Sequence, residues 1–325
     1  MLTVLITGCG GAIGTCVVKA LKMDSMDLRL IGIDADPYAA CFYLKGKGSS
    51  LNKTYIVPWA DHPKYISEVI SICSRENVDV IFPCTDAELE VLSKYRAKLD
   101  DYGTKIVSSP IRTIRICRDK WQSYNRLNKH LPIVKSALPD NGIESAIKFT
   151  GLPATIKPRI GWGSKQTYKV NTVEEAQVMV NNVHKPVIQE WLEGEEYTVD
   201  GLTDRNGNIV CVVPRLRIKV FSGLSFQGMT VRDEKLIELG KEIAQHIKII
   251  GPFNFQVRKS KGEAKIFEIN PRFSGTGILS VKAGANIPLL AVKETCNMKI
   301  PANIDFKEGL MVSRYFEEVF FEKKR

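Results

Sequence analysis

The sequence lacks an apolar run that could cross a membrane, and it lacks recurring cysteine and histidine motifs. No hydrophobic stretch approaches the ~20 residues that a bilayer-spanning helix needs. The eight cysteines never show Cys-x-x-Cys spacing, and the four histidines, His62, His130, His184 and His246, stand far apart. These absences argue against a zinc or redox centre, and we expect a reduced, cytoplasmic compartment.

A nucleic-acid-binding signature is also missing, although the chain carries a net charge of +10. Lysine and arginine are spread along the 325 residues, and neither a zinc-finger nor an RNA-recognition motif occurs. The basic surface equally suits an anionic substrate. A hydrophobic content of 44% is ordinary for a globular protein, and the length allows two or three domains.

The first third alternates apolar strands with helical segments. Strands are predicted at residues 2–7, 28–34, 78–82 and 105–108, and helices at 13–22, 63–76 and 87–98. This alternation predicts a parallel, doubly wound sheet, so we expect a Rossmann-like domain over residues 1–112. Ligands collect at the carboxyl ends of such strands, and Asp86, which follows one of them, either caps the next helix or faces a substrate.

A glycine-rich turn after the first strand suggests NAD(P) binding as an alternative function. Gly8, Gly11 and Gly14 resemble the opening of extended short-chain dehydrogenases, and Asp34 stands about where an acid would bind a cofactor ribose. Those enzymes also need a Tyr-x-x-x-Lys pair well downstream, whereas here that pair begins at Tyr43, just after the second strand. NAD(P) binding remains an alternative, because the same turn also packs a helix closely against a strand.

Two alternating segments, 253–258 and 264–270, predict a hairpin with one apolar and one polar face. We expect Phe267 and Ile269 to face the core. The opposite face then carries three oxygen-bearing side chains, those of Gln256, Glu268 and Asn270. Carboxylate and amide oxygens suit a hard divalent cation such as Mg²⁺ or Mn²⁺, which keeps open positions for phosphate oxygens.

A second hairpin joins a lysine to a glycine-rich loop. Strand 151–158 ends in Lys157, and the loop that leads to the next strand, 165–170, contains Gly161, Gly163 and Ser164. Backbone amides of such a loop can bind phosphate oxygens while the lysine supplies charge. No Gly-Lys-Ser/Thr sequence opens a helix here, so the hairpin is a phosphate cover of another kind than a Walker loop.

The segment Glu268-Ile-Asn-Pro-Arg272 resembles the metal-binding strand of the ATP-grasp superfamily. The resemblance implies that Glu268 and Asn270 hold magnesium on the phosphates of ATP. It also implies that Arg272, a fixed guanidinium directly after the strand, stabilises the phosphoryl group in transfer.

Further segments match the ATP-grasp pattern in the same order along residues 113–298. By that resemblance Lys120 reaches the nucleotide phosphates, and the backbone of Glu190, Trp191 and Leu192 reads the adenine edge. Glu196 would bind the ribose hydroxyls, with Glu195 as the second choice, and a carboxylate can accept both bonds.

In pattern the chain is similar to one synthetase module of the carbamoyl phosphate synthetase large subunit and to related carboxylate–amine ligases. One loop departs from that pattern, because residues 221–228 contain no histidine where those synthetases carry one. Phosphorylation of bicarbonate or carbamate is therefore the alternative activity. Arg215 and Arg217 precede this loop and could hold a substrate carboxylate or phosphate, although they could equally form a basic strand face. We expect Ser274 and Thr276, just past Arg272, to border the same substrate pocket.

We therefore predict an α/β chain with a Rossmann-like domain (1–112), an α+β ATP-grasp lid (113–190) and a mixed-sheet core (191–325) whose tail adds an edge strand. The resemblance implies an ATP- and magnesium-dependent ligase that joins a small-molecule carboxylate to an amine through an acyl phosphate. A non-catalytic nucleotide-binding subunit is the other alternative. We expect no membrane or nucleic-acid partner and allow for a homodimer.

Overall fold

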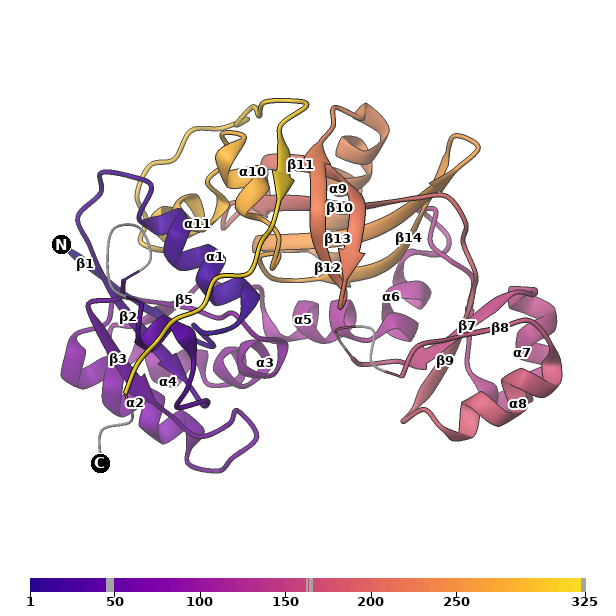
Figure 1. Cartoon of the computed structure of the whole chain (residues 1–325), viewed down its shortest axis with the longest axis horizontal. Helices are drawn as coiled ribbons and strands as arrows, with labels where there is room; N and C mark the ends of the chain where they lie inside the picture. Colours follow the sequence, from indigo (N-terminus) through magenta and orange to yellow (C-terminus); the bar gives the residue numbers. More distant parts are fainter. Residues whose placement is uncertain (45–49, 162, 164–165, 323–325) are drawn as a thin grey trace.

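The chain folds around three β-sheets, each with its own helices (Figure 1). The computed structural model describes residues 1–44, 50–161, 163 and 166–322. The N-terminal lobe and the lid lie at opposite ends of the molecule, and the core sheet stands between them (Figure 1). The core sheet therefore has the N-terminal lobe on one side and the lid on the other.

The N-terminal sheet is parallel and has the strand order β3-β2-β1-β4-β5. Its elements are β1 (Leu2–Ile6), α1 (Ala12–Leu21), β2 (Leu28–Asp34), β3 (Lys53–Ile56), α2 (Tyr65–Glu76), β4 (Val80–Phe82), α3 (Asp86–Lys94), α4 (Arg96–Asp100) and β5 (Lys105–Ile106). The predicted doubly wound sheet is confirmed. The sequence missed β3, whose side chains are half-buried or exposed at the edge of the sheet, and the helix predicted at 87–98 is two helices.

The lid follows through α5 (Ile111–Arg118) and α6 (Lys120–Leu127). Its antiparallel sheet has the order β6-β9-β7-β8, and α7 and α8 cover it (Figure 1). Its elements are β6 (Ser136–Ala137), α7 (Ile143–Thr150), β7 (Ala154–Pro158), β8 (Tyr168–Val170), α8 (Val173–Asn181) and β9 (Pro186–Glu190). The boundary predicted after residue 112 falls inside α5, because α5 already begins at Ile111.

The core sheet has six strands in the order β14-β13-β10-β11-β12-β15. Its elements are β10 (Glu195–Thr203), β11 (Ile209–Phe221), β12 (Leu224–Thr230), α9 (Glu234–Ile247), β13 (Gly251–Ser260), β14 (Glu263–Asn270), α10 (Ile278–Lys282), α11 (Ile287–Thr295) and β15 (Met311–Ser313). The six strands pair with one another only in antiparallel fashion within the described residues, although we expected a mixed sheet; one isolated parallel bridge joins Ile133 to Ile266 of β14. The predicted edge strand in the tail is β15, shorter than the alternation indicated.

The hairpin of β13 and β14 contains a bulge that the sequence did not predict. Gln256 pairs with Glu268 as expected, but the next pair joins Val257 to Ile266. Phe267 is therefore the extra residue of a bulge, and its side chain does not enter the core as predicted. Instead Phe267 lines a cleft beside the sheet, and Ile266 takes the buried place.

Candidate active site

Two hollows flank the polar face of the β13–β14 hairpin. A cleft of about 430 Å³ lies between the lid and the core sheet, and a cavity of about 860 Å³ lies between the core and the N-terminal lobe. Gln256 and Glu268 line both. A molecule in the cleft could therefore meet a molecule in the cavity at these two side chains.

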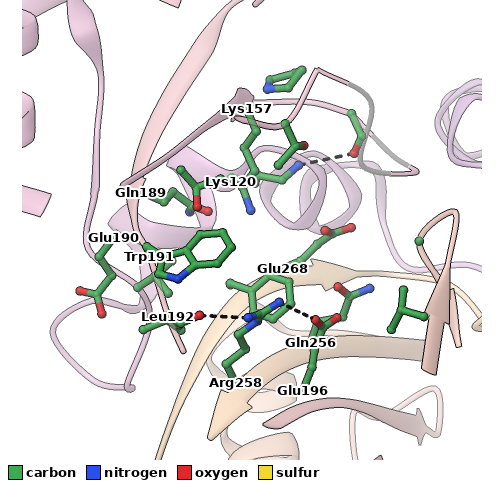
Figure 2. A pocket seen from close by; sticks show the side chains of 18 of the residues that line it. Lys120, Lys157, Gln189, Glu190, Trp191, Leu192, Glu196, Gln256, Arg258 and Glu268 are labelled. Carbon is green, nitrogen blue, oxygen red and sulfur yellow. Dashed lines mark hydrogen bonds and ion pairs between the residues drawn. The ribbon is translucent and has the colours of Figure 1, made fainter. Parts of the chain in front are cut away.

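Two lysines enter the cleft from the lid side (Figure 2). Lys157 lies at the end of β7, is 8% exposed, and has its Nζ 5.4 Å from the centre of the Phe267 ring. Burial, and then the charge of Lys120, lowers the pKa of Lys157 to about 7. Lys120 begins α6, and its Nζ donates to the Gly161 carbonyl at 3.4 Å. These positions suit groups that bind phosphate oxygens.

The loop that should cover the phosphates is described in part. Gly161 and Gly163 line the cleft, as we expected, and Gly163 has a left-handed backbone with φ +67°. Glycine adopts that conformation without the steric cost that a β-carbon brings. The predicted phosphate ligand Ser164 lies outside the described residues.

The segment that links lid to core forms one wall of the cleft. Trp191 and Leu192 line it, and the Leu192 carbonyl accepts a bond from Arg258 Nη1 at 3.0 Å (Figure 2). Glu190 lines the cleft as well, but its carboxylate forms an ion pair with Lys265 and accepts a bond from the Lys135 amide at 3.2 Å.

Glu196 is held between two arginines on the core side of the cleft. One carboxylate oxygen forms an ion pair with Arg217, and the other lies 2.9 Å from Arg258 Nη2 (Figure 2). Each oxygen keeps a second lone pair for another donor. Glu195, the second candidate for binding the ribose, is exposed and accepts a bond from the Tyr197 hydroxyl at 2.6 Å. It does not line the cleft.

Three buried polar atoms of the cleft have no hydrogen-bond partner within the described part of the chain. They are the acceptor Gln189 Oε1 and the donors Trp191 Nε1 and Arg217 Nε. Buried polar atoms without partners are rare in native proteins and commonly mark a ligand site. Gln189 was not predicted, because it resembles any other residue of an alternating strand.

The candidate metal ligands meet on one face of the hairpin. Gln256 and Glu268 are directly opposite each other, and Asn254 is opposite Asn270. Asn270 Nδ2 donates to Asn254 Oδ1 at 3.2 Å and lies 3.4 Å from Glu268 Oε1. A carboxylate with neighbouring amide oxygens is a suitable donor set for magnesium. Asn254, which the sequence analysis passed over, belongs to the same group.

Arg272 is fixed by a contact with the N-terminal lobe. Its Nε and Nη2 donate to the two carboxylate oxygens of Asp86 at 3.0 and 3.1 Å, and Nη2 also lies 3.2 Å from Asn270 Oδ1. The Arg272 guanidinium lowers the pKa of Asp86 against the opposing effect of burial. Asp86 does not cap α3; the cap is Thr85, whose hydroxyl accepts a bond from the Glu88 amide.

Arg215 is enclosed within the core, which contradicts its predicted contact with substrate. It is 1% exposed and forms a two-bond ion pair with Asp200, at 2.8 and 2.9 Å. Its Nη1 donates to the Thr276 hydroxyl at 2.8 Å, and its Nη2, which also bonds Asp200, donates to the Ser274 hydroxyl at 3.1 Å. Both Ser274 and Thr276 line the cavity. Arg217 lines both hollows but is already paired with Glu196.

The glycine-rich turn of the N-terminal lobe uses its acid internally. The Gly10 amide donates to Asp34 Oδ2 at 2.8 Å, and Asp34 Oδ1 accepts from the Asp36 amide at 3.0 Å. A β-carbon on Gly14 would lie 2.5 Å from Cys9 Cα and from the Gly8 carbonyl, so this glycine is needed for packing. The turn therefore has a structural explanation that does not require a dinucleotide.

Two family models match the chain. Residues 182–318 match a family described as ATP-grasp in the biosynthetic pathway with Ter operon, and residues 4–107 match the PylC-like N-terminal domain. The carbamoyl phosphate synthase large chain of Gemmatimonas aurantiaca is 25% identical over 301 residues, which cover 83% of this chain. The chain spans about a quarter of the length of the curated relatives that it matches, between 21% and 28%.

Solved structures agree on the fold. An ADP complex of PurK, N5-carboxyaminoimidazole ribonucleotide synthetase, has a TM-score of 0.74 at 17% identity, covering 94% of this chain and 80% of that one. The biotin carboxylase domain dimer of Hydrogenobacter thermophilus 2-oxoglutarate carboxylase, with MgADP and bicarbonate, scores 0.77 at 14% identity and covers 94% and 73%. L-amino acid ligase from Bacillus licheniformis scores 0.68 at 15% identity and covers 91% and 74%.

The class is defined in two parts: residues 182–318 match the ATP-grasp superfamily and residues 4–107 match a PylC-like N-terminal domain, and the three-sheet fold agrees with both matches. Within that superfamily it resembles a single synthetase module of the carbamoyl phosphate synthase large chain, as the sequence motifs indicated. Within the described residues, no helix combines the length and the apolar character that crossing a bilayer requires.

Proposed function

We propose that the chain is an ATP-dependent carboxylate–amine ligase. The observation that carries the proposal is the junction of the two hollows, where Gln256 and Glu268 line both the nucleotide cleft and the larger cavity. This junction suits transfer of a phosphoryl group from a nucleotide to an acceptor.

In the proposed reaction a carboxylate oxygen attacks the γ-phosphorus of ATP, and ADP leaves. An amine then attacks the carbonyl carbon of the acyl phosphate, phosphate leaves with the C–O bond electrons, and the nitrogen loses a proton to give the amide. Lys120 and Lys157 would neutralise phosphate charge, Glu196 would accept bonds from the ribose hydroxyls, and Arg272 would stabilise the group in transfer.

The adenine would lie against the segment Gln189–Leu192. The unpartnered Gln189 Oε1 is a suitable acceptor for an exocyclic amine, which adds this residue to the predicted set. Gln256, Glu268 and Asn270 would hold magnesium, whose positive charge would offset that of the phosphate oxygens. We also infer domain limits near residues 112 and 190, a homodimer and a cytoplasmic location.

A matrix of carboxylates and amines tests the function directly. With ATP and magnesium, we expect phosphate release that needs one carboxylate and one amine, and a product lighter than their sum by one water. Glu268→Gln should abolish release, whereas Glu263→Gln, an exposed change on the same strand, should not. Dependence on NAD(P)H, or nucleotide binding without ADP formation in any mixture, would contradict the ligase.

Bicarbonate phosphorylation remains the second candidate because of the similarity to carbamoyl phosphate synthase. A cavity of about 860 Å³ is far larger than bicarbonate requires, which favours a larger acceptor. Bicarbonate-dependent formation of carbamoyl phosphate in the same matrix would reverse this preference.

A further inference from the structure

The larger cavity has an excess of negative charge. Its charged lining consists of five carboxylates and three guanidiniums, and no lysine lines it among the described residues: Asp34, Asp61, Asp86, Glu88, Glu268, Arg118, Arg217 and Arg272. Such a lining disfavours a further anionic group on a substrate, beyond the one carboxylate that the proposed ligation requires.

All three arginines already have carboxylate partners. Arg118 forms an ion pair with Glu90, Arg217 with Glu196, and Arg272 with Asp86. Their charges are therefore largely neutralised before any ligand enters, and an incoming anion would have to compete for them.

Four of the five acids form no ion pair within the described chain: Glu268, which is a candidate metal ligand, and Asp34, Asp61 and Glu88. Glu88 is 7% exposed, and among the described residues its carboxylate accepts side-chain bonds only from hydroxyl groups. The Thr7 and Thr85 hydroxyls donate to Oε2 at 2.9 and 2.8 Å, and the Tyr65 hydroxyl donates to Oε1 at 3.1 Å. Burial raises the pKa of Glu88, as expected for a carboxylate without a counter-charge.

An aromatic side chain completes this wall of the cavity. Pro58, Trp59, Ala60 and Asp61 line it as one continuous segment, and Trp59 is 68% exposed although it is large and apolar. An indole face and a carboxylate together are a favourable environment for an ammonium group, because both attract a cation. Ile13 and Leu224 supply further apolar surface that suits the carbon chain of a ligand.

We propose that this cavity binds a substrate carrying a protonated amine, and that Asp34, Asp61, Glu88 and Trp59 select it. The inference rests on the proposed ligase function and names the class of one substrate: a compound with an aliphatic chain and an ammonium group distinct from the nitrogen that attacks. Diamines and amino acids with basic side chains belong to this class.

The test uses three primary amines of equal carbon count that differ only at the far end: cadaverine, its amino-alcohol analogue and its amino-acid analogue. Binding to the full chain is measured by calorimetry with a non-hydrolysable ATP analogue and magnesium present. We expect cadaverine to bind at least roughly tenfold more tightly than the alcohol, and the carboxylate to bind most weakly. Equal affinities, or tightest binding of the carboxylate, would overturn the proposal.

Variants identify the selecting residues. Asp61→Asn and Trp59→Leu change exposed side chains and should reduce the preference for cadaverine several-fold. Asp34→Asn keeps an oxygen for the Gly10 amide and should do the same. The matched control is Asp24→Asn, an exposed acid of the same lobe outside both hollows, which should leave the preference intact. The assignment would be overturned if the control lost the preference for cadaverine, or if all three variants kept it.

Failure of this inference can be told apart from failure of the ligase function. Cadaverine selectivity without ADP formation in any mixture would sustain the cation site and contradict the ligase. ATP-dependent amide formation that favours the amine with the terminal carboxylate would sustain the ligase and contradict the cation site.

Discussion

At the residue scale, the clearest departure from ordinary chemistry is Lys157. It is a buried lysine whose pKa is lowered to about 7, because burial and the nearby Lys120 disfavour its charged form. Phosphate oxygens would favour the charged form and so raise this pKa. Above pH 7, therefore, nucleotide binding should take up a proton, and affinity should fall as the pH rises.

Calorimetry at pH 8 in two buffers of different ionisation enthalpy measures this proton uptake. Lys157→Ala should abolish it and weaken ATP binding by about 1.5–3 kcal/mol, roughly 10- to 150-fold in Kd. Lys148→Ala removes an exposed lysine of α7 in the same lid and should change neither quantity. Unchanged affinity and proton uptake in Lys157→Ala would show that this lysine does not meet phosphate.

Asp86 is the residue that orients Arg272. The ion pair joins side chains 186 positions apart and holds the guanidinium next to Asn270. In Asp86→Asn we expect kcat to fall by about 10²-fold with ATP affinity nearly unchanged, because misplacement of a group that acts in the transition state affects turnover more than binding. Asp101→Asn, an exposed acid of the same lobe, serves as the control.

A steady-state measurement of kcat and KM, with ATP affinity from calorimetry, separates the outcomes for Asp86→Asn. An equal loss of ATP affinity would mean that Asp86 acts on nucleotide binding instead. A normal kcat would show that turnover does not depend on the orientation of Arg272 by Asp86.

At the element scale, the β7–β8 hairpin should act as the cover of the nucleotide. Gly163 has φ +67°, and no described atom lies within 4 Å of where its β-carbon would be. Gly163→Val should therefore strain the loop without a clash and weaken ATP binding several-fold. Gly103→Val is the matched control, because Gly103 also has a left-handed backbone, with φ +73°, and open space around its β-carbon position. Gly103 lies in a turn outside the cleft.

Binding and melting experiments compare the two glycine variants. Both should lose about 1 kcal/mol or more of stability from the left-handed backbone, but only Gly163→Val should lose ATP affinity. Equal ATP affinities in the two variants would argue that the hairpin does not close on the nucleotide.

The elements themselves were largely predictable, and their exceptions have local causes. Alternation located β13 and β14, and with them the face that carries Gln256 and Glu268, because side chains alternate along a strand. The bulge at Phe267 inserts one residue and leaves no signal in that pattern. Arg215 was misjudged because a basic alternating strand does not reveal that Asp200, on the neighbouring strand, neutralises it.

At the scale of the whole molecule, the three sheets place the cleft and the cavity next to each other at the polar face of the β13–β14 hairpin. The lid supplies lysines to the cleft, and the N-terminal lobe supplies Asp86 and the acidic wall to the cavity. Beyond β15 the chain passes α1, where Arg314 contacts Cys16, and reaches the N-terminal lobe (Figure 1). There Phe321 stacks on Tyr43 with ring centres 3.5 Å apart.

Contacts between lobes could not be predicted from the sequence. The motifs identified Arg272 and Glu268 individually, but the partner of Arg272 lies on α3, in another part of the chain. The acidic lining likewise combines residues from separate loops, Asp34, Asp61 and Glu88, which share no sequence pattern. Such sites depend on tertiary packing, so they emerge only when the lobes are assembled.

The most direct test of the central claim follows the oxygen atoms of the carboxylate. The carboxylate identified in the substrate matrix is labelled with oxygen-18 and incubated with ATP, magnesium and the amine, and the released phosphate is analysed by mass spectrometry. An acyl-phosphate pathway predicts one oxygen-18 atom in each phosphate, because the carboxylate oxygen that attacks phosphorus leaves with it. Amide formation that releases only unlabelled phosphate would contradict the account.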